Sequence, residues 1–457
     1  MADMSTPSIP AIFKAYDIRG LVDKELTADF AFATGVAFAH FLKQEREPGT
    51  VVIGEDMRPS SPKLASAFSA GVTSQGLDVI RIGLASTDML YFAAGKLNLP
   101  GAMFTASHNP AAYNGIKLCL SGARPIGKES GLLTIENYVR EGIPVQVHSV
   151  GVEKQQNMLT EYVDHLFSLV TINPDRKLKI VIDAGNGMAG HTAPEIAKRL
   201  NADVIELYFE LDGMFPNHEA NPIEPSNMKD LQKAVKKHGA DIGLAFDGDA
   251  DRCFLVDEKG ELVNPSALTG LIATRELKKN PGANIIYNLI SSRAVKEVVE
   301  ENGGGAVRSR VGHSYIKKLM AETNAVFGGE HSGHFYFRDF WKADSGALAA
   351  LHAIAALSES DAPLSQVLAP FNRYYSSGEI NSQVADAQGA MKEIENIYGP
   401  QSGIELDHLD GLTVSADTWW FNLRASNTEP LLRLNVEAST PQRMAEVRDE
   451  VLNTIRK

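Results

Sequence analysis

The chain has 457 residues, of which 44% are hydrophobic and 22% charged, a composition typical of globular proteins. At roughly 150 residues per domain, this length suggests about three domains. The formal net charge of −13 argues against a general binder of nucleic acid or of anionic membranes, because both need a basic face.

Two cysteines, Cys119 and Cys253, each lie in an apolar run and lack the spacing of a metal site. Two thiols in so long a chain do not make a disulfide framework, so we predict two core residues. The first residues show no basic segment followed by an apolar one, as a signal peptide would. The longest apolar stretch, 346–357, is too short to span a bilayer. We therefore expect a cytoplasmic protein.

Short β-rich apolar runs alternate with longer amphipathic segments over most of the chain. Helices are predicted at 30–42 and 61–74. Strands are predicted at 51–53, 79–82, 102–104, 178–182, 204–208, 242–246, 284–287 and 325–327. This alternation predicts βαβ units with mostly parallel sheets. Ligands of such sheets bind beyond the carboxyl ends of the strands.

The last stretch has a different pattern, with close-set strands at 412–415, 419–423 and 431–437 before a helix that starts at Pro441. This order predicts a small α+β domain with an antiparallel sheet. Linker-like segments at 144–154, 256–260 and 362–378 separate the parts of the chain. The predicted domains are 1–150, 151–257, 258–370 and 371–457.

An aspartate cluster, Asp247-Gly-Asp249-Ala-Asp251-Arg252, follows a predicted strand. In an extended loop, alternate residues project to one side, so three carboxylates could converge on one hard cation such as Mg²⁺. Without a cation, these charges would repel one another. An EF-hand is rejected because Arg252 stands where that loop requires glycine, and the alternative to a metal site is a solvated acidic turn.

Three further loops are rich in reactive or hydrogen-bonding groups. Phe104-Thr-Ala-Ser-His-Asn-Pro110 is either an ordinary loop or a serine nucleophile presented on a rigid turn. Arg424-Ala-Ser-Asn-Thr-Glu-Pro430, with Arg433 beyond it, suits the oxygens of a phosphate monoester, although a polar turn between two strands is by itself the better interpretation of the Ser-Asn-Thr segment. Gly328-Gly-Glu-His-Ser-Gly-His334 offers a carboxylate and a hydroxyl for sugar hydroxyls, or is a connection with structural histidines.

These four loops, together with Tyr16-Asp-Ile-Arg-Gly20, resemble the α-D-phosphohexomutase superfamily over essentially the whole chain, and most of all its phosphomannomutase/phosphoglucomutase group. The resemblance implies an α/β fold: three similar mixed α/β domains and a C-terminal α+β domain around a central cleft. In order, the domains would hold the phosphoserine loop, the metal loop, the sugar loop and the phosphate loop. The implied reaction moves phosphate reversibly between the 1- and 6-positions of a hexose.

The resemblance also implies roles for individual residues. Ser107 would carry the phosphate, and its phosphate would join three aspartates around Mg²⁺: Asp247, Asp249 and Asp251. The remaining implied catalytic residues are Arg19, Lys117, Arg252 and His313. The implied substrate-binding residues are Tyr16, Glu330, Ser332, Arg424, Ser426, Asn427, Thr428 and Arg433. We expect nearby arginines to lower the pKa of Lys117 and so suit it to proton transfer.

The implied substrate is a hexose phosphate, with a hexose 1,6-bisphosphate as activator and intermediate that reorients as the fourth domain hinges. Differences in the Gly-Glu-His-Ser-Gly-His loop favour mannose as the sugar, with glucose tolerated. Arg310-Val311 stands where some members of the family have Lys-Thr. The alternative enzymes are a phosphoglucosamine mutase and an enzyme that acts mainly as a phosphoglucomutase. The alternative without catalysis is a sugar-phosphate sensor. A serine hydrolase is disfavoured, because adjacent Ser107 and His108 cannot easily pair. We expect a monomer or homodimer that binds neither nucleic acid nor membrane.

Overall fold

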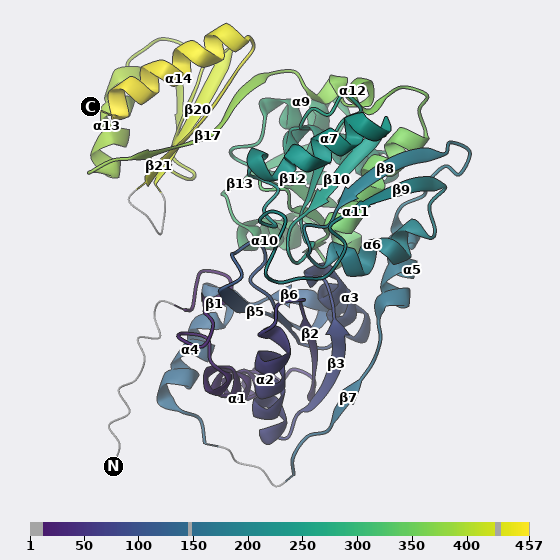
Figure 1. Ribbon diagram of the computed structural model, residues 1–457. Helices are drawn as coiled ribbons and strands as arrows, with labels where there is room; N and C mark the ends of the chain where they lie inside the picture. The colour runs from purple at the N-terminus through teal and green to yellow at the C-terminus, as the bar shows by residue number, and fades with distance from the viewer. Residues whose placement is uncertain (1–11, 145–148, 426–430, 457) are drawn as a thin grey trace. The chain divides into compact units, whose positions relative to one another are not determined.

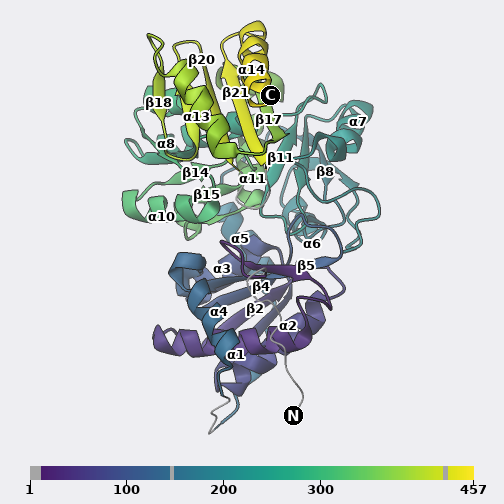
Figure 2. The same cartoon turned by 90° about the vertical axis from the view of Figure 1, so that its left-hand side faces the viewer.

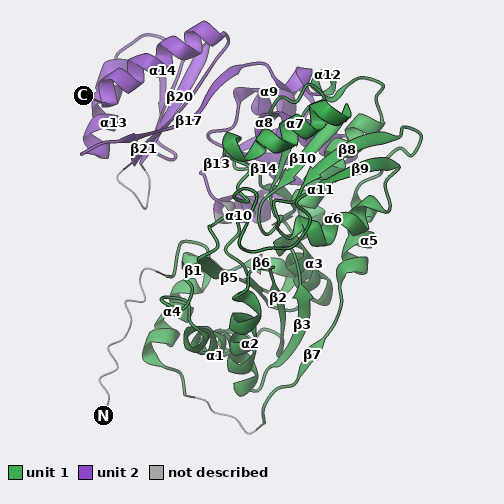
Figure 3. Cartoon of the chain, in the orientation of Figure 1, with its two compact units in different colours: residues 1–263, 332–367 green, residues 264–331, 368–457 purple. Residues whose placement is uncertain are grey.

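The computed structural model describes residues 12–144, 149–425 and 431–456. The chain divides into two compact units (Figure 3). One unit comprises residues 1–263 and 332–367, and the other comprises residues 264–331 and 368–457.

The first sheet has the strand order β1-β5-β4-β2-β3-β7, with β6 paired to β5. Its strands are β1 (Ile18–Leu21), β2 (Thr50–Glu55), β3 (Asp78–Leu84), β4 (Gly101–Phe104), β5 (Tyr113–Leu120), β6 (Arg124–Pro125) and β7 (Glu153–Gln155). Its helices are α1 (Ala28–Gln44), α2 (Ser61–Ser74), α3 (Thr87–Leu97), α4 (Leu132–Glu141) and α5 (Leu159–Leu169), with 3₁₀ turns at Ser121–Ala123 and Lys128–Ser130. Helices α1 and α2 pack together beneath the sheet in Figure 2.

The sheet is mixed because β5 runs antiparallel to both β1 and β4. Strand β4 ends at Phe104, and β5 begins at Tyr113. The turn between them returns the chain directly alongside β4, with which β5 is paired. This tight return holds the Ser107 loop between two paired strands.

The second sheet, in the same unit, has the order β11-β10-β8-β9. Strands β8 and β9 lie parallel with β10, and β11 is antiparallel to it. The elements are β8 (Leu178–Asp183), α6 (Ala189–Ala197), β9 (Ala202–Leu207), a 3₁₀ turn (Pro225–Met228), α7 (Lys229–His238), β10 (Ile242–Phe246) and β11 (Cys253–Val256). The unit also contains β15 (Phe335–Phe337), a 3₁₀ turn (Arg338–Phe340), β16 (Ala343–Asp344), α11 (Gly346–Ser358) and α12 (Leu364–Val367).

The other unit contains a parallel group in which β12 lies between β13 and β14. Its elements are α8 (Pro265–Lys279), β12 (Asn284–Asn288), α9 (Arg293–Glu301), β13 (Gly305–Ser309), α10 (His313–Thr323), β14 (Phe327–Gly329) and a 3₁₀ turn (Ala369–Phe371). The strand expected at 325–327 begins at Phe327, because Asn324 adopts a left-handed conformation that ends α10 and turns the chain.

The C-terminal part of this unit forms the predicted antiparallel sheet, with the order β17-β21-β20-β19-β18. Helices α13 and α14 cover its face and share one apolar core with it (Figure 1). The elements are β17 (Tyr375–Gln383), α13 (Ala387–Tyr398), β18 (Glu405–Asp407), β19 (Leu412–Ser415), β20 (Trp419–Ala425), β21 (Leu431–Ala438) and α14 (Pro441–Ile455). The α+β prediction for this segment is confirmed.

Cys119 and Cys253 are buried free thiols, as predicted from their apolar surroundings. In the described residues, no helix has both the length and the apolar character needed to cross a membrane.

Helices α1 and α2 approach each other so closely that their backbones touch. A Cβ on Gly35 would lie 2.2 Å from the Phe68 carbonyl oxygen, and a Cβ on Gly71 would lie 2.2 Å from the Phe32 carbonyl oxygen. No side chain can move to relieve a clash with a helix backbone. This glycine contact therefore sets how tightly the two helices pack under the strands that bear the Ser107 loop.

We expect Gly71→Ala to force α1 and α2 apart and to lower the free energy of unfolding by about 1–3 kcal/mol, as overpacking does in other cores. Urea denaturation followed by circular dichroism would measure the change. Gly49→Ala is the matched control, because a Cβ at Gly49 meets nothing within 4 Å. Equal stability of the two variants would contradict this account of the helix contact.

Candidate active site

Ser107 lies in a tight turn directly after β4 and is buried. Its backbone has a φ of 50°, a left-handed conformation that few residues other than glycine adopt. The Thr105 hydroxyl accepts a hydrogen bond of 2.9 Å from the Ser107 backbone nitrogen. Ser107 Oγ donates to Asp247 Oδ2 at 2.7 Å. The serine is thus held in a strained turn against the metal loop, which favours the nucleophile interpretation.

The side chains of Ser107 and His108 lie close together although the two residues are neighbours in the chain. Ser107 Oγ lies 3.2 Å from His108 Nδ1, and the backbone at Ser107 is left-handed. Burial, with Arg252 and Arg19 nearby, holds the pKa of His108 well below its usual value, so the imidazole is neutral near pH 7. Because the Ser107 hydroxyl donates its one hydrogen to Asp247, its oxygen is the acceptor in the contact with His108, and the contact is not a nucleophile–base pair.

Arg58 holds the Ser107 turn through hydrogen bonds to its main chain, a role that the sequence analysis missed. Its buried guanidinium donates to four main-chain carbonyl oxygens: those of Ser107 (2.8 Å), Asn109 (2.7 Å), Pro110 (3.0 Å) and Tyr113 (2.9 Å). Its Nε donates to Asp56 Oδ2 at 3.2 Å, and the Phe215 ring lies 5.1 Å from its central carbon. The only sequence signal was a charged pair placed directly after the buried strand β2.

Three carboxylates converge in the loop after β10. The candidate ligand oxygens of Asp247, Asp249 and Asp251 all lie within 4.8 Å of one another, and all three residues are buried. The loop is a turn rather than the extended segment predicted: Ala250 has a φ of 60°, and its nitrogen donates to the Asp247 carbonyl oxygen. The convergence was correctly predicted, but the turn rather than alternation produces it.

The carboxylates have oxygens left over for a cation. Asp249 Oδ2 accepts from Thr87 Oγ1 at 2.6 Å and from Lys117 Nζ at 2.7 Å. Asp249 Oδ1 is buried without a hydrogen-bond partner among the described residues, whereas Asp251 Oδ1 lies 3.5 Å from His334 Nε2. Burial and repulsion from the other two aspartates raise the pKa of Asp247 well above its usual value. A donor set of crowded, buried carboxylate oxygens fits a hard divalent cation, so these residues can hold a metal ion.

The expected lowering of the Lys117 pKa is wrong. Lys117 Nζ lies 2.7 Å from both Asp249 Oδ2 and Asp251 Oδ2. Burial lowers the pKa of Lys117, but these carboxylates outweigh it, and the pKa is raised well above its usual value. The nearest charges are acidic rather than basic, and they keep the ammonium protonated.

Both predicted arginines of the first unit lie at this site. Arg252 Nε is 3.4 Å from Asp247 Oδ2, and the Arg252 nitrogen donates to Asp247 Oδ1 at 3.2 Å. Arg19, on β1, donates to Asn109 Oδ1 at 2.6 Å and pairs with Asp17. Tyr16 is half-buried just before β1.

His334 belongs to a loop that the sequence analysis singled out, but no role was predicted for it. His334 Nε2 lies 3.5 Å from Asp251 Oδ1, and its Nδ1 lies 2.9 Å from the hydroxyl of Ser332, a predicted substrate-binding residue. An isolated antiparallel β-bridge between Arg252 and His334 joins the segment of Ser332 and His334 to the metal loop. The sugar-loop hydroxyl therefore contacts a histidine that reaches the carboxylate cluster.

The first turn of α3 contacts the metal loop at Asp249. Asp88 is buried and accepts hydrogen bonds from the hydroxyls of Ser86 (2.5 Å), Tyr162 (2.6 Å) and Ser345 (2.6 Å). Burial raises its pKa to about 6. The neighbouring Thr87 donates from its hydroxyl to Asp249 Oδ2, and its nitrogen donates to the Asp249 carbonyl oxygen at 3.0 Å. Thr87 thereby sets which oxygen of Asp249 remains free.

The other predicted residues belong to the second unit. Glu330 is buried, and its Oε1 accepts from the Gly312 nitrogen at 3.1 Å, directly before His313 begins α10. Arg424 on β20 and Arg433 on β21 are paired in register. Arg310 lies 4.0 Å from Asp410 and over the Tyr315 ring. Ser426, Asn427 and Thr428 lie outside the described residues.

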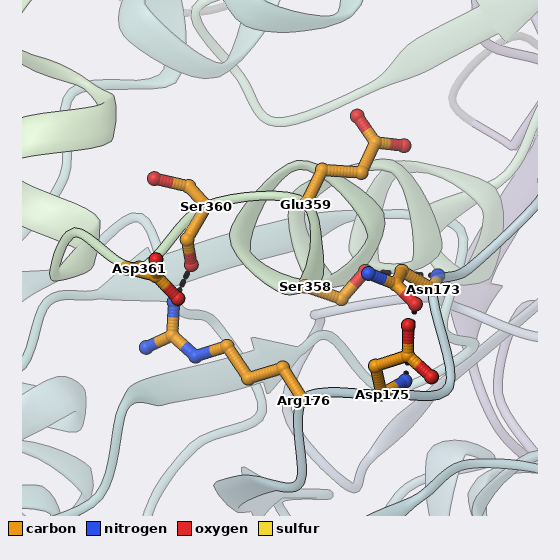
Figure 4. Close-up of a pocket in the computed structure, with 7 residues that line it drawn as sticks. All are labelled: Asn173, Asp175, Arg176, Ser358, Glu359, Ser360 and Asp361. Atoms are coloured by element: carbon orange, nitrogen blue, oxygen red, sulfur yellow. Dashed lines mark hydrogen bonds between the residues drawn. The ribbon is translucent and has the colours of Figure 1, made fainter.

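A surface pocket of about 400 Å³ contains none of the predicted site residues (Figure 4). It lies between the segment before β8 and the end of α11, and its lining residues are Asn173, Asp175, Arg176, Ser358, Glu359, Ser360 and Asp361. Arg176 donates to carbonyl oxygens in the last turn of α11 and just beyond it, including those of Leu357 (2.9 Å) and Ala362 (3.1 Å), and to Asp241 Oδ1 (3.2 Å). Its role here is to anchor the helix end.

The chain matches all four domains described for phosphoglucomutase/phosphomannomutase: alpha/beta/alpha domain I over residues 10–144, domain II over 160–260, domain III over 264–374, and the C-terminal domain over 379–454. It belongs to the phosphoglucomutase/phosphomannomutase family. The four-domain α/β architecture inferred from the sequence resemblance is confirmed.

Named relatives cover nearly the whole chain. A protein of Xanthomonas campestris pv. campestris named "Phosphohexose mutases" is 42% identical over 98% of this chain and 100% of its own length. A "Phosphomannomutase" of Escherichia coli K12 is 40% identical over 97% of this chain and 98% of its own length. A solved phosphoglucomutase/phosphomannomutase family protein of Burkholderia thailandensis matches with a TM-score of 0.88 and 32% identity over 97% of both chains.

We expect Arg58→Lys to reduce kcat by tenfold or more with little change in KM, because a lysine cannot hold four carbonyl groups in one plane. It should also lower the free energy of unfolding by about 2–4 kcal/mol, since several hydrogen bonds to a charged group are lost. Steady-state kinetics and thermal unfolding would measure both. Arg140→Lys, at an exposed position of α4, is the control. An Arg58→Lys enzyme with unchanged kcat would refute the positioning role.

We expect Thr87→Val, which removes one hydroxyl at nearly constant volume, to weaken Mg²⁺ binding by about tenfold, as loss of an outer hydrogen bond does at other metal sites. Titration calorimetry with Mg²⁺, and electron paramagnetic resonance with Mn²⁺, would measure the affinity without catalysis. Thr87→Ser keeps the donor and should bind like the unmodified protein. If the valine and serine variants bind equally, the hydroxyl does not position Asp249.

Proposed function

We propose that this chain is a phosphomannomutase, an isomerase that interconverts mannose 6-phosphate and mannose 1-phosphate and also acts on glucose phosphates. The single observation that carries the proposal is the hydrogen bond of Ser107 Oγ to Asp247 inside a cluster of three buried aspartates. Relatives at about 40% identity that are named phosphomannomutase support the assignment. In this proposal Ser107 carries the phosphate, and a hexose 1,6-bisphosphate is the intermediate.

The proposed metal ion is Mg²⁺, held by Asp247, Asp249, Asp251 and an oxygen on Ser107. When bound, it would draw negative charge from the phosphoryl group. The arginines of the site, Arg19 and Arg252, would neutralise charge on the phosphoryl oxygens during transfer.

Proton transfer is assigned to Lys117, with His313 as a second candidate. The ion pairs of Lys117 support a role as general acid, which donates a proton to the sugar oxygen as phosphate returns to Ser107. His313 begins α10.

Sugar and phosphate recognition is assigned to the remaining predicted residues. Glu330, Ser332 and Tyr16 would bind the sugar and its hydroxyls. The non-reacting phosphate would be held by Arg424, Ser426, Asn427, Thr428 and Arg433, and this set is called the phosphate clamp below. Each end of the bisphosphate must occupy the clamp in turn. The proposal includes domain boundaries after residues 150, 257 and 370. It also includes a protein that is a monomer or a homodimer.

A ³¹P NMR experiment tests the function directly. Purified protein with Mg²⁺ and a trace of hexose 1,6-bisphosphate should convert mannose 6-phosphate to mannose 1-phosphate, and Ser107→Ala should not. Parallel reactions with glucose and glucosamine phosphates rank the sugars. Release of inorganic phosphate would indicate a phosphatase instead, and a preference for the amino sugar would indicate a phosphoglucosamine mutase.

A further inference from the structure

Glu379, which the proposed function does not use, lies between the two arginines of the phosphate clamp. Its Oε2 is 3.3 Å from Arg424 Nη2, and its Oε1 is 3.3 Å from Arg433 Nη1. The carboxylate thus gives one oxygen to each guanidinium. These two atoms are the only ion-pair partners of Glu379 within the described part of the chain.

The strand register explains this arrangement. Arg424 on β20 lies opposite Arg433 on β21, and Arg433 in turn lies opposite Asn381 on β17. Glu379 is two residues from Asn381, so its side chain points to the same face of the sheet. A carboxylate at this position reaches across two strands to both arginines. The contact is therefore built into an ordered sheet rather than made by a loop.

A second carboxylate, Asp410, lies farther from the clamp. Asp410 Oδ2 is 3.8 Å from Arg424 Nη1, and the same oxygen accepts a hydrogen bond of 3.2 Å from the Val311 nitrogen. Glu379 is therefore the nearer carboxylate to Arg424, and within the described part of the chain it is the carboxylate paired with Arg433. The side chains of Glu379 and of the two arginines are partly accessible to solvent. Their exposed fractions are 12% for Arg424, 27% for Glu379 and 32% for Arg433.

We propose that Glu379 is a built-in counter-ion of the arginine pair Arg424 and Arg433, whose donors it occupies in the free protein and yields to the non-reacting phosphate. The inference rests on the proposed function, because it takes these arginines to bind that phosphate. A carboxylate and a phosphate both present two oxygens to guanidinium groups, so the two anions compete for the same donors.

This competition has a use in a mutase. A pair of arginines without a counter-ion would repel each other and hold a phosphate dianion tightly. Each turnover requires one phosphate to leave the clamp and the other to enter. Glu379 lowers the cost of leaving, because it replaces the departing phosphate at once. Affinity for the phosphate is thereby reduced in favour of turnover.

Glu379→Gln keeps the side-chain shape and removes the charge, so it tests the proposal. Binding of inorganic phosphate, measured by titration calorimetry at low ionic strength, should tighten by roughly three- to tenfold, the scale of one charge interaction near a protein surface. In steady-state kinetics, KM and kcat should both fall. Glu393→Gln, on the exposed face of α13, removes the same charge elsewhere in the domain and should change neither quantity.

The result that overturns the proposal is Glu379→Gln binding phosphate no more tightly than Glu393→Gln does. Weaker binding would also overturn it, since Glu379 would then be orienting the arginines for phosphate. Arg424→Gln separates this inference from the proposed function. If Arg424→Gln binds phosphate like the unmodified protein, the clamp assignment itself fails. If it binds weakly while Glu379→Gln has no effect, only the counter-ion role fails.

Discussion

Three carboxylates buried in one turn create the electrostatic constraint around which the site is organised. Asp247, Asp249 and Asp251 have almost no contact with solvent, so their mutual repulsion is poorly screened. The protein answers it with cationic and hydroxyl groups from distant segments: Lys117 from β5, Thr87 from α3 and Arg252 from the loop itself. These groups leave Asp249 Oδ1 buried without a hydrogen-bond partner among the described residues, and the three carboxylates can hold a divalent cation.

Positioning of the serine depends on main-chain contacts more than on side-chain chemistry. Phosphoryl transfer relies on alignment of the attacking and leaving oxygens, so small displacements of the nucleophile are costly. Arg58 holds the carbonyl groups around Ser107, and the anchored Asp88 holds the helix end that orients Asp249. Both are buried charged residues whose hydrogen-bonding capacity is spent on supporting other residues.

The proposed phosphate clamp has charges opposite to those of the aspartate loop. Its two arginines, Arg424 and Arg433, are paired with Glu379 from β17. In both places the chain supplies part of the balancing charge itself. A site built this way binds a ligand less tightly than a bare cluster of like charges would, which suits the reorientation of a bisphosphate that we propose.

The sequence by itself determined the α/β alternation, the antiparallel C-terminal sheet and the four loops, because strand periodicity and clusters of reactive side chains are local properties of a chain. It located Ser107 and the three aspartates for the same reason. Tertiary structure alone decided the protonation of Lys117, the contact of Ser107 with His108, and the roles of Arg58, Thr87 and Glu379. Each of these depends on a partner's distance or on a local backbone angle, and a pKa or a hydrogen bond is set by the charges and atoms that folding brings within a few ångströms.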